Sequence, residues 1–202
     1  MPLVALFVGL LPAAGAYAAV DVTVQPPAVS RVAFDRRWPP REMPVSADFG
    51  AVCSNVFEIE ANIASSVESL SPTGVRIYPT NFSIITRLRV TIYLPKRWPV
   101  KLRAHEEGHR AIGEHYYGHA DAAAREAASS LIGRSFEASG ADRAAAERAA
   151  GELVLAALKD AYMQRTHARS AAANARYDAI TDHGRRAMLE TEAVAAAVAS
   201  DP

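Results

Sequence analysis

Two histidines and a glutamate lie close together in the segment HEEGHR at positions 105–110, which contains the pattern HExxH. On an α-helix, residues four apart lie on the same face, so His105 and His109 can direct their imidazole nitrogens at one point. This arrangement provides two ligands for one zinc ion. Glu106 lies beside that point, where a carboxylate can accept a proton from a water molecule that the metal activates. The segment therefore predicts a zinc-dependent hydrolase, and in particular a protease.

A catalytic zinc site needs a third protein ligand, and the neighbouring histidines are the first candidates. His115 follows His105 by ten residues, which is the spacing of the metzincin motif. That motif has a turn-forming glycine at the position that Ile112 occupies here. If the helix continues instead, His115 lies about 15 Å farther along its axis. His119 lies farther still, so both histidines fit a helix surface better than the metal site.

A second polar stretch, YDAITDHG at positions 177–184, ends a long predicted helix. Gly184 is well placed to end that helix. A helix packed antiparallel to the HExxH helix would bring His183, Asp182 or Asp178 to the metal. Alternatively, the Asp and Thr side chains of this stretch cap the helix end by binding backbone groups.

The two motifs, in this order and separated by a long helical stretch, resemble a family of bacterial predicted secreted zinc-dependent proteases. The resemblance covers the region from about Ile84 to Gly184. It implies a set of zinc ligands and a general base, namely His105, His109 and His183 as ligands and Glu106 as the base. Asp182 and Asp178 stay open as alternatives to His183.

Three further polar side chains near the motifs have expected roles. Tyr177 is the candidate donor to the developing oxyanion if its stretch lies over the zinc, and otherwise an aromatic residue that packs a helix end. Glu107 and Arg110 are expected to point away from the metal and to form ion pairs. The catalytic residues predicted from the sequence are therefore Glu106 and Tyr177.

The pattern of apolar residues predicts the elements that position these motifs. Alternation over 56–61, 74–78 and 84–94 predicts strands, and the last has Leu88, Val90, Ile92 and Leu94 on one face. Helices are expected over 100–136 and 141–181, separated by Gly140. The expected fold class is α+β, with a small, mostly antiparallel sheet from the N-terminal half packed against long helices.

Composition excludes several classes of partner. Lys+Arg and Asp+Glu number 22 each among 202 residues, so the net charge indicates neither nucleic acid nor an anionic membrane surface. The length fits one domain, which we place at 51–202, after a proline-rich extended segment, 19–50, that can supply one edge strand. Cys53 is the only cysteine, so no intramolecular disulfide is possible, and we expect an inert thiol.

Residues 1–18 have the features of a cleaved signal peptide. An apolar run over 3–11 is followed by Pro12, and Ala16-Tyr17-Ala18 places small residues where a signal peptidase requires them. We therefore expect a secreted or periplasmic protein that acts on a peptide or protein substrate, without stable membrane insertion after cleavage.

Two other classes of function fit the same sequence. One is a non-catalytic module in which a fully liganded zinc ion, held by His105, His109, His183 and an aspartate, joins two helices. The other is an exported helical interaction protein without metal, whose alanine-rich helices form the binding surface.

Overall fold

The structure is a computed structural model that describes residues 19–44, 50–97 and 99–199, so the predicted signal peptide lies outside the described residues. Five strands and five helices are assigned in these ranges: β1 (Val20–Val24), β2 (Ala28–Phe34), β3 (Val52–Ser71), β4 (Gly74–Pro95), α1 (Val100–Tyr117), α2 (Ala120–Ser129), β5 (Phe136–Ser139), α3 (Arg143–Arg165), α4 (His167–Thr181) and α5 (Glu190–Ala199). The fold is α+β, as expected. None of the described helices combines the length and the apolar composition needed to cross a bilayer.

Strand β4 is the partner of every other strand in the sheet. One of its edges pairs with β3 in a long antiparallel hairpin, from Val52 opposite Tyr93 to Ser71 opposite Gly74. Its other edge pairs in parallel with β1 and β2 and antiparallel with β5. Within the described part of the chain, β3 therefore has a second edge that pairs with no strand.

The expectation of a mostly antiparallel sheet is wrong, because the sheet is mixed. Strands β1 and β2 run parallel to β4, and both come from the proline-rich segment 19–50. That segment was expected to supply one edge strand ahead of the domain, but it supplies two strands of the same sheet. Local alternation shows that a stretch is extended, whereas the direction of pairing depends on a partner that is distant in the sequence.

The predicted face of the last strand is confirmed. Leu88, Val90, Ile92 and Leu94 are all buried, and the stretch that contains them belongs to β4. The two shorter predicted strands belong to β3 and to the start of β4. On the opposite face, Arg89 forms an ion pair with Glu58 of β3. The sheet therefore has one apolar face toward the helices and one face with charged pairs.

Both predicted long helices are interrupted. The first, predicted over 100–136, ends at Tyr117, restarts as α2 and is followed by strand β5. The second, predicted over 141–181, breaks at Thr166 into α3 and α4. The C-cap of α4 is Asp182, whose backbone is in the left-handed region, and Gly184 follows with φ +76°. Neither break contains proline, so the pattern of apolar residues alone did not reveal it.

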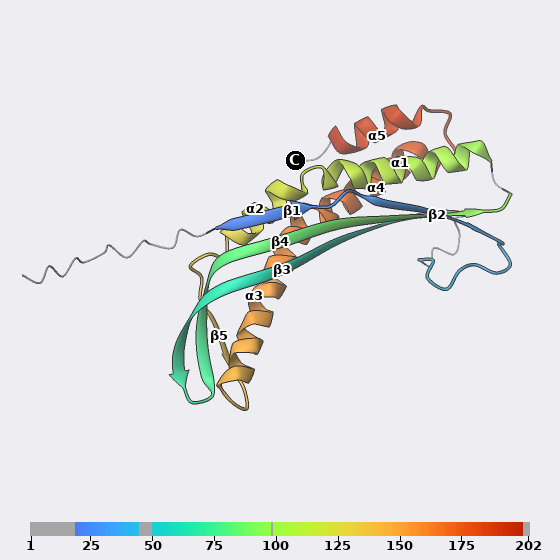
Figure 1. Cartoon of the computed structure of the whole chain (residues 1–202). Coiled ribbons are helices and arrows are strands. Elements are labelled where there is room, and N and C mark those ends of the chain that lie inside the picture. The colour runs from blue at the N-terminus through green and yellow to red at the C-terminus, as the bar shows by residue number, and fades with distance from the viewer. Residues whose placement is uncertain (1–18, 45–49, 98, 200–202) are drawn as a thin grey trace, which may run out of the picture.

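Three helices lie together over one end of the sheet (Figure 1). Helix α1 packs on β3 and β4, α4 packs beside α1, and α5 packs on both of these helices. At the other end, α3 packs on β4 and β5. On α3, residues at every fourth position form a buried stripe, namely Ala146, Ala150, Val154, Leu158 and Tyr162. The two motifs identified in the sequence lie on α1 and α4, so their side chains meet where these helices contact each other.

Candidate metal centre

Helix α1 places the two motif histidines side by side. Its N-cap is Pro99, and the helix continues without a break to Tyr117. The Nε2 atoms of His105 and His109 are 3.1 Å apart, so the predicted convergence of the two imidazoles is present. Because α1 continues past His109, His115 lies more than a turn farther along, and it is exposed. His119 is also exposed, and neither residue belongs to the cluster described next.

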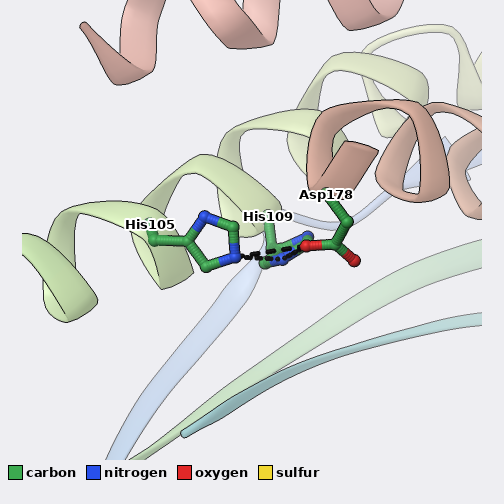
Figure 2. A group of neighbouring side chains, drawn as sticks. All are labelled: His105, His109 and Asp178. Carbon is green, nitrogen blue, oxygen red and sulfur yellow. Dashed lines mark hydrogen bonds and ion pairs between the residues drawn. The ribbon is translucent and has the colours of Figure 1, made fainter. Parts of the chain in front are cut away.

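Asp178 of α4 completes a group of three candidate ligands. Its Oδ1 atom lies 3.2 Å from Nε2 of His105 and 3.1 Å from Nε2 of His109. Figure 2 shows the carboxylate of α4 meeting the two imidazoles of α1. Among the described residues, these three form the group of histidine, cysteine or acidic side chains that could hold a metal ion.

The spacing of the three atoms fits a tetrahedral zinc site. Ligand bonds of about 2.0–2.1 Å at the tetrahedral angle place neighbouring ligand atoms about 3.3 Å apart. The distances among the two Nε2 atoms and Oδ1 are 3.1, 3.2 and 3.1 Å. Two imidazoles and one carboxylate are a donor set that zinc accepts, and three protein ligands leave a fourth position for a water molecule or substrate.

His183, the third ligand implied by the resemblance, lies beside this group and outside it. It follows the end of α4 with φ +51°, and its Nδ1 atom is 3.5 Å from Oδ1 of Asp178. Its side chain is 39% exposed. Asp182 faces Arg185 at 3.8 Å. Of the three alternatives that the sequence left open, Asp178 is the one that meets both helix histidines.

Glu106 is buried next to the group and is not part of it. Its carboxylate accepts a hydrogen bond from the backbone N–H of Cys53 in β3. Burial raises the pKa of Glu106, although this hydrogen bond and the nearby His109 and His105 oppose the shift. A carboxylate adjacent to the candidate ligands is placed to act as a general base, and a raised pKa makes it a stronger base than an exposed glutamate.

Asn174 orients the imidazole of His109, and the sequence analysis missed it. Its Oδ1 atom is 2.7 Å from Nδ1 of His109. The orientation of the amide is fixed because its Nδ2 donates to the carbonyl of Ser170 at 2.9 Å. His109 therefore carries a proton on Nδ1, which leaves Nε2 as the nitrogen that faces Asp178 and that would ligate a metal ion. A signal was present: Asn174 stands four residues before Asp178 on an alanine-rich helix.

Tyr177 packs behind the histidines. The side chain is fully buried, and its ring stacks on the ring of His105 with centroids 4.9 Å apart. Its hydroxyl donates to the carboxylate of Glu190 in α5. Burial and this bond raise the pKa of Tyr177. Of the two roles considered from the sequence, this placement fits the packing role, and the donor role toward an oxyanion has no support in the geometry.

The charges of the group are strongly coupled. Burial raises the pKa of Asp178, but hydrogen bonds to His105 and His109 outweigh it and bring the pKa well below its ordinary value. Burial lowers the pKa of His109, and the Asp178 carboxylate more than offsets this and raises it. A cation would bind the imidazole nitrogens that face Asp178, and a proton on either nitrogen must leave first. Metal binding at this group is therefore coupled to proton release.

The two other charged residues of the first motif point elsewhere, as expected. Glu107 pairs with Arg31 of β2 at 2.8 Å and with Arg110 at 2.7 Å. Arg110 also pairs with Glu114 at 2.6 Å. This chain of ion pairs joins α1 to β2 and leaves Glu106 as the acidic residue of the motif that faces the candidate ligands.

A cavity of about 460 Å³ opens over the group. His105, Glu106, His109 and Asp178 all line it. Its walls come from the start of β3, from the first turns of α4 and from the turn that follows α4. The candidate metal ligands and the candidate base therefore border the same cavity.

No family model matches the sequence, and neither the search of characterised proteins nor that of solved structures finds a similar chain.

Proposed function

We propose that this protein is a zinc-dependent peptidase. The observation that carries the proposal is the meeting of His105, His109 and Asp178 at zinc-like spacing inside a cavity that Glu106 also lines. The first two residues, together with Glu106, are those expected from the HExxH pattern. Asp178 replaces His183 as the proposed third ligand, because it contacts both imidazoles.

The residues of the chain have separate tasks in the proposed reaction. When bound, a zinc ion supplies Lewis-acid polarisation of the scissile carbonyl and of the attacking water. Glu106 accepts a proton from that water and returns it to the leaving amine. Burial prepares Glu106 for this task by raising its pKa. Asn174 keeps His109 in the tautomer that ligation requires.

A peptide is the substrate class that the surroundings favour. The stretch from Ala51 to Cys53 lines the cavity, together with Asn55, and belongs to or directly precedes β3. Among the described residues, the outer edge of β3 pairs with no strand, whereas β4, the strand just before α1, has both edges occupied there by β2 and β3. An extended peptide can add to such an edge through backbone hydrogen bonds. Its scissile bond would then lie near Glu106.

A purely structural zinc site agrees less well with the same geometry. A structural site fills all four positions of the ion with protein ligands. Here the group holds three ligand atoms, and Glu106 lines the adjacent cavity without joining them. Export remains part of the proposal on the strength of residues 1–18 alone.

Metal content and hydrolysis together test the proposal. The chain from Ala19 onward should carry about one zinc by elemental analysis and should cleave a library of internally quenched peptides. Glu106→Gln should keep the metal and lose at least a hundredfold in kcat, as expected for a general base. Glu107→Gln is the matched control, because its carboxylate belongs to the ion pairs with Arg31 and Arg110. If the wild-type protein takes up no zinc even after loading, the peptidase proposal is wrong.

A further inference from the structure

Tyr177 contacts both of the candidate histidine ligands at once. Its ring is nearly parallel to that of His105, with an interplanar angle of 15°, and it meets His109 edge-on with centroids 5.0 Å apart. The side chain is fully buried. A displacement of this ring would therefore change the space available to both imidazoles.

The position of Tyr177 is set by its hydroxyl. The hydroxyl donates to Glu190 and also lies 3.2 Å from the backbone carbonyl of His105. It fits between α1 and α5 because residue 108 is glycine. A β-carbon at Gly108 would lie 2.1 Å from the Tyr177 oxygen.

Glu190 is distinguished from the other acidic residue at the start of α5. Glu190 and Glu192 both lie in the first turn, where a negative charge favours any helix. Glu192 is exposed, whereas Glu190 reaches the buried hydroxyl of Tyr177. The far end of α5 has its own attachment, since Nε of Arg176 donates to the carbonyl of Ala197 at 2.9 Å. The contact with Tyr177 is thus more than a general means of docking α5.

We propose that Glu190 is a positioning residue of the metal centre: it holds the hydroxyl of Tyr177 and thereby fixes the ring that supports His105 and His109. This inference rests on the proposed zinc site. Without the Glu190 carboxylate, the acceptor left to the hydroxyl is the His105 carbonyl at 3.2 Å, and the ring shifts toward it. Partners that act behind metal ligands typically change metal affinity ten- to a hundredfold.

The test is a double-mutant cycle on zinc affinity. The zinc dissociation constant of the full chain is measured by competition with a chromophoric chelator, and cobalt absorption reports the ligand geometry. Glu190→Ala and Tyr177→Phe should each weaken binding about tenfold or more. Because both remove the same hydrogen bond, the double variant should lose little beyond either single change. Glu190→Gln, which keeps an acceptor oxygen, should retain most of the affinity, and Glu192→Ala should bind as the wild type does.

The outcomes separate this inference from the proposed function. If the wild-type chain binds no zinc, the peptidase proposal fails and this inference fails with it. If the wild type binds zinc but Glu190→Ala binds equally well, only the positioning role is overturned. Additive losses in the double variant would also overturn it. Thermal unfolding of the metal-free variants identifies a loss of affinity that only reflects a less stable fold, which again contradicts the proposal.

Discussion

The Oδ1 atom of Asp178 lies 3.1 Å from Nε2 of His109, so α4 presents a carboxylate directly to the HExxH helix. We therefore expect Asp178→Ala to remove most of the bound zinc, because only two ligands would remain. His183→Ala should keep it, since His183 approaches Asp178 and lies outside the group. Elemental analysis of the two variants measures the difference. A loss of metal in His183→Ala but not in Asp178→Ala would instead support the ligand set implied by the resemblance.

Asn174→Ala should weaken zinc binding about ten- to a hundredfold while the protein stays folded. The change removes the acceptor that holds the proton of His109 on Nδ1. Competition with a chelator gives the affinity, and far-ultraviolet circular dichroism checks the fold. Gln164→Ala, an exposed amide on α3, serves as the control. An unchanged zinc affinity would show that the hydrogen bond does not tune the site.

Gly108→Ala should destabilise the protein by about 1–3 kcal/mol, because the new methyl group would overlap the hydroxyl of Tyr177. Gly151→Ala is the matched control. Gly151 also lies within a helix, and a β-carbon there would meet nothing within 4 Å. That variant should be stabilised by roughly 0.5–1 kcal/mol, from the better helix propensity of alanine. Urea unfolding of both variants gives the two free energies, and equal effects would contradict the packing described for Tyr177.

Cys53 should react slowly with thiol reagents in the folded protein. Burial raises the pKa of its thiol, and the neighbouring Glu106 carboxylate adds to the shift. Since the thiolate is the reactive form, a raised pKa leaves less of it at pH 8 than in a free cysteine. We expect labelling by iodoacetamide to be at least tenfold slower in the native chain than in urea. Rapid labelling of the native chain would contradict both the burial of the thiol and its raised pKa.

Local spacing predicted the part of the site that lies within one helix. His105, Glu106 and His109 share α1, and their relative placement follows from helix geometry alone. Asp178 was one of three alternatives because the choice depends on how α4 packs against α1 and where the left-handed turn after Thr181 begins. Asn174 was overlooked because its position four residues before Asp178 becomes a signal only once Asp178 is known to face the histidines.

The fold shows the same division between local and distant information. The alternation in β4 was read correctly, since one strand determines its own faces. The parallel partners β1 and β2 were not foreseen, because nothing in a short, proline-rich segment encodes a pairing with residues so far along the chain. The interruption at Gly118 and at Thr166 likewise depends on packing that the helix pattern does not contain.

The sharing of β4 by all other strands has a consequence for the order of folding. The β3–β4 hairpin closes a short connection between Ser71 and Gly74, whereas β1 and β2 must reach β4 across the whole hairpin. Closing the longer loops costs more chain entropy, so we expect the hairpin to form first and the two parallel strands to join it later. Pulse-labelling hydrogen exchange should then protect the amides through which β4 pairs with β3 before those through which β2 pairs with β4. Earlier protection in β2 would contradict this order. If it holds, the cavity wall formed by β3 is assembled before the N-terminal strands complete the sheet.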